Sequence, residues 1–151
     1  MTTVIFDLDG TLADTSGDLI VAANWCFVQM GQGELLHPKR DAAIGMRGGR
    51  AMLTCGLERL GKMDEAVVDA YYPKLLEAYR AKIDVHTRLF PGAMEAVGRL
   101  RASGVKVGIC TNKPVALAEE LLDRLGVQSK RYGDEPFMGQ SLSVRRSTPL
   151  N

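Results

Sequence analysis

The stretch VIFDLDGT, residues 4–11, places two carboxylates directly after a short apolar run. Residues 3–7 are nearly continuously apolar, which is typical of a strand buried on both faces of a parallel sheet. A turn before Gly10 needs only one Asp or Asn, so the second carboxylate calls for a chemical explanation. Asp7 and Asp9 are therefore the first candidate site residues.

A second strand is predicted at residues 105–110, where the sequence VKVGIC has apolar, β-branched residues at alternate positions. Phe-Pro-Gly at residues 90–92 opens a helix before this strand, and a leucine stripe after residue 114 indicates another helix behind it. The order strand, helix, strand, helix is typical of parallel sheets with right-handed crossovers. We therefore predict an α/β fold with a Rossmann-like parallel sheet.

The segment between the two strands has helical rather than strand character. A helix is predicted at residues 18–30, and residues 35–82 show only helical periodicity. This pattern predicts a small all-helical cap inserted after the first strand. Residues 131–151 show no sustained period and are predicted to be an irregular tail. The predicted boundaries are residues 1–15 and 85–130 for the sheet core, 16–84 for the cap and 131–151 for the tail.

Composition and charge exclude several classes of protein. Apolar residues make up 46% and charged residues 25% of the chain, the usual balance for a globular protein. The formal charge of +1 is too small to indicate a nucleic-acid or anionic-membrane partner. Three dispersed cysteines without CxxC spacing argue against a disulfide framework. No signal peptide and no spanning stretch of about 20 apolar residues is recognised. We therefore expect a cytoplasmic protein.

The polar residues after the two predicted strands form a phosphate-handling set. Ligands of parallel α/β sheets bind beyond the carboxyl ends of the strands, so both clusters are expected around one small anion. The Asp7 carboxylate can attack phosphorus to form an aspartyl-phosphate. Asp9 can protonate the leaving oxygen and later accept a proton from water. Gly10 would allow a tight turn that exposes backbone N–H groups to phosphate oxygens.

The second cluster supplies neutral and positive groups for the same anion. Thr111, Asn112 and Lys113 are candidate phosphate-binding residues, with Lys113 offsetting charge. A phosphate dianion about 4 Å from one carboxylate is repelled by roughly 8 kcal/mol at an effective dielectric of about 20. One lysine cannot offset two carboxylates and that dianion. The sequence therefore predicts Mg²⁺, which binds through one or two carboxylates and keeps several waters.

Each cluster also has a purely structural interpretation. Asp-Gly alone is most often a turn, and Thr-Asn-Lys-Pro alone is most often a helix entry with Asn112 as cap and Pro114 near the first position. The two clusters occur together at the ends of two apolar strands, which favours the chemical interpretation.

The motifs also resemble a known family. FDLDGTLADT, residues 6–15, resembles the DxDGTxxD signature of the haloacid dehalogenase superfamily, and ICTNKP, residues 109–114, resembles its second, Ser/Thr motif. Residues 89–114 are similar throughout to the phosphoglycolate phosphatase-like branch. The helical insertion resembles the small cap of that branch, and the resemblance spans residues 1–130.

The resemblance assigns a role to each motif residue. It implies that Asp7 is the nucleophile and a Mg²⁺ ligand. It implies that Asp9 is the general acid/base and lends a backbone carbonyl to the metal, and that Thr111 binds the phosphoryl group. The superfamily's dehalogenases and phosphonate hydrolases lack the second acid, so phosphomonoester hydrolysis or phosphomutase chemistry is favoured. In the cap loop, Arg47 and Arg50 are candidate substrate contacts, with a solvated helix start as the alternative for each.

The end of the chain departs from the family pattern. The third motif of the family is a Lys usually followed by Pro; SVRRSTPLN, residues 143–151, resembles that stretch with Arg146 in the lysine position. Gly133-Asp134 has the letters of the acidic fourth motif but comes too early and follows no apolar strand. We therefore expect a chain truncated or divergent after about residue 130, with C-terminal core strands missing. Its first strand would then form a sheet edge and favour a homodimer.

The predicted function is a Mg²⁺-dependent phosphatase that acts on a small phosphomonoester, similar to phosphoglycolate, through an aspartyl-phosphate. The expected partner is a small phosphorylated metabolite. Two alternatives remain open. One is a catalytically impaired fragment that folds or self-associates without turnover. The other is phosphoryl transfer similar to that of β-phosphoglucomutase.

Overall fold

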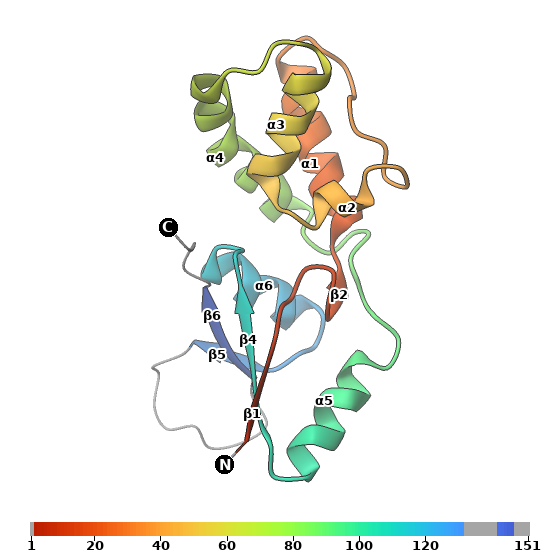
Figure 1. The fold of residues 1–151 in the computed structure, drawn as a ribbon, viewed down its shortest axis with the longest axis vertical. Helices are drawn as coiled ribbons and strands as arrows, with labels where there is room; N and C mark the ends of the chain where they lie inside the picture. Colours follow the sequence, from red (N-terminus) through yellow and green to blue (C-terminus); the bar gives the residue numbers. More distant parts are fainter. Residues whose placement is uncertain (1, 132–141, 147–151) are drawn as a thin grey trace. The chain divides into compact units, whose positions relative to one another are not determined.

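The structure, a computed structural model, describes residues 2–131 and 142–146 and consists of two compact units (Figure 1). One unit contains the described residues up to Asp14 and from Arg88 onward, and it carries the parallel sheet. The other unit is Thr15–Thr87, and its described elements are all helices. The predicted cap, residues 16–84, lies within this second unit.

The sheet has four parallel strands in the spatial order β1-β4-β6-β5. Helix α5 packs against β4, whereas helix α6 packs against β5 and β6. Figure 1 shows β4 between β1 and β6. The α/β class and the parallel sheet predicted from the sequence are confirmed. The element bounds are β1 Thr3–Phe6, β4 Lys106–Thr111, β5 Ser129–Arg131, β6 Leu142–Arg146, α5 Ala93–Ala102 and α6 Val115–Arg124.

The C-terminal segment differs from the prediction of an irregular tail. Leu142–Arg146 forms β6, which pairs in parallel with β4 on one side and β5 on the other. Leu142 and Val144 are buried, and these two apolar residues are too few to produce a recognisable strand period. Pairing with both neighbouring strands therefore makes this segment a strand. Gly133 and Asp134 lie outside the described residues.

Strand β1 is less buried than its apolar sequence predicts. Among the described residues β1 pairs with β4 alone and lies at an edge of the sheet. Ile5 is 58% exposed, and Val4 and Phe6 are half-buried. The sequence correctly places this strand at an edge but wrongly expects burial on both faces, which requires elements packed over each face of the sheet. Self-association through this edge stays a prediction.

A two-stranded antiparallel ribbon was not foreseen. Strand β2 (Ala13–Asp14) pairs with β3 (Arg88–Leu89), and the Phe90 N–H donates to the Leu12 carbonyl at 2.9 Å. The ribbon joins the chain segments that leave and re-enter the sheet unit. Two-residue strands carry no sequence period, so only pairing across the fold reveals them.

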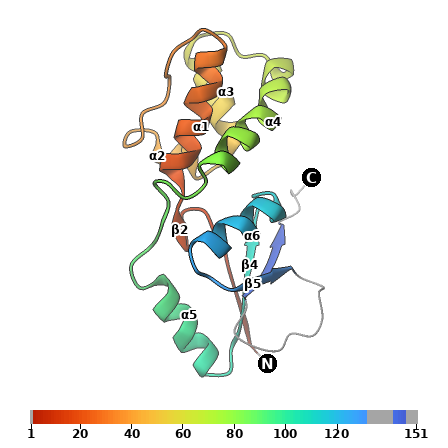
Figure 2. The same cartoon turned by 180° about the vertical axis from the view of Figure 1, so that it is seen from behind.

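The helical unit contains four helices, seen from behind in Figure 2. Helix α1 contacts the other three, and α3 also packs against α4. The centre of this unit is apolar, with Phe27, Met52 and Leu75 fully buried. The all-helical insertion predicted from the sequence is confirmed. No helix in the described ranges 2–131 and 142–146 is long and apolar enough to cross a membrane. The bounds are α1 Ser16–Gln29, α2 Ala42–Gly45, α3 Gly49–Arg59 and α4 Glu65–Ala81.

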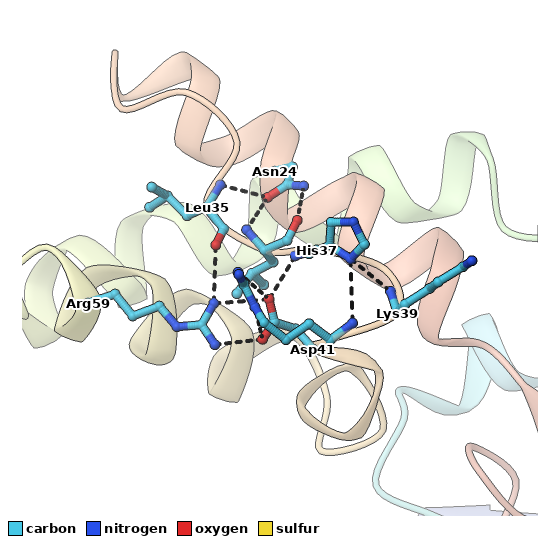
Figure 3. A network of polar contacts seen from close by, with 8 residues as sticks. Asn24, Leu35, His37, Lys39, Asp41 and Arg59 are labelled. Carbon is cyan, nitrogen blue, oxygen red and sulfur yellow. Dashed lines mark hydrogen bonds and ion pairs between the residues drawn. The ribbon is translucent and has the colours of Figure 1, made fainter.

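A polar network orders the segment between α1 and α2 (Figure 3). The buried Asp41 carboxylate accepts hydrogen bonds from Arg59 at 2.6 and 3.0 Å and from the His37 N–H at 2.7 Å. The Asn24 side chain accepts from the Leu36 N–H at 3.0 Å and donates to the Leu36 carbonyl at 2.8 Å. These contacts anchor a loop that has few apolar side chains of its own.

We expect Asp41→Asn to destabilise the helical unit. The pKa of Asp41 lies well below its usual range, mainly because the Arg59 guanidinium donates hydrogen bonds to the carboxylate. A lowered pKa in the folded state means that this stabilisation is present at neutral pH and is lost as the pH falls below about 4. Replacing the carboxylate should lower the free energy of unfolding at pH 7 by about 2 kcal/mol, the scale of a charge-assisted hydrogen bond. The variant should also lose less stability on acidification.

Urea unfolding followed by circular dichroism at pH 7 and pH 3 measures both effects. Asp69→Asn is the matched control, because Asp69 also pairs with an arginine, Arg50, but its side chain is 61% exposed. That exposed pair should contribute less than about 1 kcal/mol. Equal losses in the two variants would contradict a stabilising role specific to Asp41.

Candidate active site

A tight turn directs the two carboxylates beyond the end of β1. The N–H groups of residues 11–13 all donate to the Leu8 carbonyl at 3.0–3.2 Å, and the Gly10 N–H donates to the Ala13 carbonyl at 2.8 Å. Gly10 has φ 79°, a left-handed conformation that favours glycine. Leu8 is fully buried and anchors the turn. The predicted tight turn is present, and the Gly10 N–H is engaged within it.

Parallel pairing brings the second cluster to the same edge of the sheet. Phe6 of β1 is the register partner of Ile109 of β4, so the residues after Phe6 emerge beside the end of β4. Thr111, the last residue of β4, is 1% exposed, and Lys113 is 6% exposed. Both polar side chains are therefore buried close to the carboxylates that follow β1.

Asp9 is the centre of the contacts that the structure describes in this cluster. The Lys113 Nζ lies 3.0 Å from Asp9 Oδ1, and the Thr111 hydroxyl donates to Asp9 Oδ2 at 3.5 Å. The Lys113 backbone N–H in turn donates to the Thr111 hydroxyl at 3.1 Å. Two residues predicted to bind phosphate therefore contact the predicted proton carrier.

Asp7 lies at the exposed end of the cluster, and its Oδ1 accepts the Leu8 N–H at 2.7 Å. Partial burial of the carboxyl, and then the neighbouring Asp9 charge, raises the pKa of Asp7, against the Leu8 hydrogen bond and the Lys113 charge. Burial lowers the pKa of Lys113, and the charges of Asp9 and Asp7 oppose that shift. The site thus has excess negative charge near Asp7, which favours a bound cation.

The carboxylates are also the donors available to a metal. Within residues 2–131 and 142–146, no group of three or more His, Cys, Asp or Glu side chains lies together in a way that could hold a metal ion. The Asp7 carboxylate and the Asp9 backbone carbonyl, the two donors implied by the motif, stay the candidate ligands.

Asn112 and Arg146 lie at the same edge of the sheet as the cluster. Asn112 is exposed directly after β4, and α6 begins at Val115 with Pro114 as its N-cap. The structural alternative, in which Asn112 caps this helix, is therefore wrong. Arg146 is the last residue of β6, is exposed, and is the register partner of Thr111.

The two cap arginines belong to the helical unit. Arg47 is exposed after α2. Arg50, in the first turn of α3, forms an ion pair with Asp69, and its guanidinium lies 5.3 Å from the centre of the Tyr72 ring. Arg50 thus has partners on α4, whereas a role of either arginine in substrate binding stays a prediction.

Sequence reasoning missed the contact between Lys113 and Asp9. The sequence identifies both residues as site candidates but assigns Lys113 to the phosphate. The available signal was their position: each follows one of two adjacent parallel strands by a few residues. An ammonium and a carboxylate buried so close together pair with each other.

Comparison with known proteins places these motifs in context. A sequence model of haloacid dehalogenase-like hydrolases matches residues 1–137. The chain is 34% identical over 143 residues to phosphoglycolate phosphatase of Agrobacterium fabrum, covering 94% of this chain and 60% of the relative. It is 34% identical over 147 residues to phosphoglycolate phosphatase of Xanthomonas campestris, covering 97% and 64%. The chain thus spans less than two thirds of the length of these relatives.

A solved structure shares the fold. A haloacid dehalogenase-like hydrolase of Streptococcus pneumoniae superposes with a TM-score of 0.71 at 20% identity, covering 99% of this chain and 62% of that one. At this identity the similarity shows the fold alone. The structural comparison therefore supports the fold, and the sequence comparisons support the family.

Proposed function

Because the chain belongs to the haloacid dehalogenase-like hydrolase family, we propose that it is a phosphatase that hydrolyses a small phosphomonoester, phosphoglycolate or a close analogue. One observation carries this proposal: Asp7 and Asp9 follow β1 at the edge of the sheet where Thr111 and Lys113 follow the adjacent β4. The activity named for the two relatives supports the substrate class.

The geometry suits a two-step reaction. In the first step an Asp7 carboxylate oxygen attacks phosphorus, the bond from phosphorus to the leaving oxygen breaks, and protonated Asp9 gives its proton to that oxygen. In the second step water attacks the phosphorus of the aspartyl-phosphate and gives a proton to Asp9. The bond from phosphorus to Asp7 breaks, which releases phosphate and restores both carboxyl groups.

The donor set fits Mg²⁺. The Asp7 carboxylate and the Asp9 backbone carbonyl are oxygen donors, and Mg²⁺ in phosphate sites binds through one or two carboxylates while keeping several waters. The repulsion between Asp9 and Asp7, which contributes to the raised pKa of Asp7, would be relieved by a cation. When bound, the ion would offset negative charge on the phosphoryl group. Thr111 and Asn112 stay the proposed groups around that anion, whereas the Lys113 ammonium is paired with Asp9.

The test is phosphate release from 2-phosphoglycolate and from other small phosphomonoesters by the unmodified chain. We expect release with Mg²⁺, a fall of at least about 100-fold with EDTA because a metal supplies several kcal/mol here, and recovery with excess Mg²⁺. Colorimetric phosphate detection measures all three results.

Two other outcomes would replace the proposal. Phosphate binding without release from any substrate would support the catalytically impaired alternative. Conversion of β-glucose 1-phosphate to glucose 6-phosphate without net phosphate release would support the mutase alternative. Calorimetry with inorganic phosphate and chromatography of the sugar phosphates distinguish the two.

A further inference from the structure

Both side chains of the ion pair between Lys113 and Asp9 are buried. The Lys113 Nζ lies 3.0 Å from Asp9 Oδ1, and the two side chains are only 5% and 6% exposed. Removing such charges from water costs several kcal/mol each, and a short contact between opposite charges offsets that cost. This contact is therefore a defined part of the site rather than a chance approach of two flexible side chains.

The same residue engages Asp9 by a second route. The Lys113 backbone N–H donates to the Thr111 hydroxyl at 3.1 Å, and that hydroxyl donates to Asp9 Oδ2 at 3.5 Å. Lys113 thus contacts one carboxylate oxygen directly and orients the group that contacts the other. An arrangement that engages both oxygens restricts the rotation of the carboxyl group.

The cation expected from the third motif is placed differently. Arg146 is exposed at the end of β6, whereas Lys113 is buried beside the carboxylate. Lys113 is thus a buried basic side chain in direct contact with the proton carrier. Lys113 follows β4, the strand that ends in Thr111.

We propose that Lys113 is a positioning residue for Asp9: before substrate binds it holds the proton carrier in place through a buried ion pair and through Thr111, rather than binding the substrate phosphate. When Asp9 carries the proton, the Lys113 ammonium still donates a hydrogen bond to its carboxyl oxygen. The catalytic part of this inference rests on the proposed phosphatase function. The pairing itself does not.

Leaving-group dependence tests the catalytic part. An alkoxide leaving group needs a proton from Asp9, whereas the phenolate of p-nitrophenyl phosphate leaves readily without one. We expect Lys113→Met to lower kcat for 2-phosphoglycolate by about 100-fold, the lower range of general acid catalysis, and for p-nitrophenyl phosphate by less than about tenfold, with little change in KM. A rise in KM of equal size for both substrates would overturn the inference, because a lost phosphate ligand predicts it.

Lys106→Met is the matched control for this series. Lys106 is exposed at the other end of β4, so the same substitution there should leave both substrates unaffected. If Lys113→Met does not fold, Lys113→Gln removes the charge but keeps a hydrogen-bond donor. It should show the same dependence on the leaving group with a smaller loss.

A double-mutant cycle in unfolding tests the pairing without any turnover. Asp9→Asn and Lys113→Met should each raise the unfolding equilibrium constant at least tenfold, and the double variant should raise it far less than the product of the two. If the effects of the two substitutions on the unfolding equilibrium constant simply multiply in the double variant, the two residues act independently and the proposed pairing is wrong. If the unmodified chain hydrolyses nothing, the proposed function and the catalytic role of Lys113 both fail, while this cycle still decides whether Lys113 holds Asp9.

Discussion

The Asp7→Asn variant is expected to release phosphate about 10⁴-fold or more slowly than the unmodified chain, the scale on which enzymes lose turnover with their nucleophile. The amide cannot attack phosphorus, so the first step is blocked. The fold should persist, because Asp7 is exposed and the asparagine oxygen can still accept the Leu8 N–H that Asp7 accepts at 2.7 Å.

Acid quenching during turnover of ³²P-labelled substrate measures the same step directly. The unmodified chain should retain label on the protein as an acyl phosphate, and Asp7→Asn should retain none. Asp123→Asn is the matched control, since Asp123 is an exposed carboxylate on α6 of the same unit and should change neither rate nor label. Undiminished turnover by Asp7→Asn would exclude Asp7 as the nucleophile.

Gly56→Ala is expected to destabilise the helical unit by overpacking its centre. A Cβ atom at Gly56 would lie 2.2 Å from Cζ of Phe27 and 2.8 Å from both of its Cε atoms. The Phe27 ring is fully buried, so any shift of the ring must displace other packed side chains. Overpacking of this kind costs about 1–3 kcal/mol or more, which exceeds the gain of about 1 kcal/mol from replacing glycine inside a helix. We expect a net loss of about 2 kcal/mol in the free energy of unfolding.

Gly98→Ala is the matched control for this prediction. Gly98 lies inside α5 and a Cβ there meets no atom within 4 Å, so the same substitution should stabilise the protein by up to about 1 kcal/mol. In a Phe27→Leu background the smaller side chain leaves room, and Gly56→Ala should then cost much less. Urea unfolding of the four variants measures these differences. An undiminished cost in the Phe27→Leu background would show that Phe27 is not the cause.

Much of the sheet unit could be predicted because its signals are local. Each of two apolar runs, one ending in Asp7 and Asp9 and the other in Thr111, specifies a strand with a polar end. Parallel strands joined through helices must place those ends at one edge of the sheet. The helical unit was predictable for the same reason, since its periodicity is contained within single helices.

The parts that were missed depend on contacts between distant residues. The segment Leu142–Arg146 is a strand because β4 and β5 pair with it. The exposure of Ile5 depends on which elements pack over that face of the sheet. Neither the pairing of residues 142–146 nor the exposure of Ile5 can be predicted from the local sequence. The need for glycine at position 56 likewise depends on Phe27, almost thirty positions away in the chain. Only the tertiary fold brings the Phe27 ring so close to Gly56 that a Cβ atom does not fit.

The sequence by itself determined which groups meet at the end of the sheet: two carboxylates, a threonine hydroxyl and a lysine ammonium. Only the tertiary structure decided how these groups pair. Burial leaves the Lys113 ammonium and the Asp9 carboxylate little water, so the two charges contact each other at 3.0 Å, while Asp7 stays at the exposed end of the cluster. The order of residues supplies the reactive groups, and the exclusion of water determines which of them are neighbours.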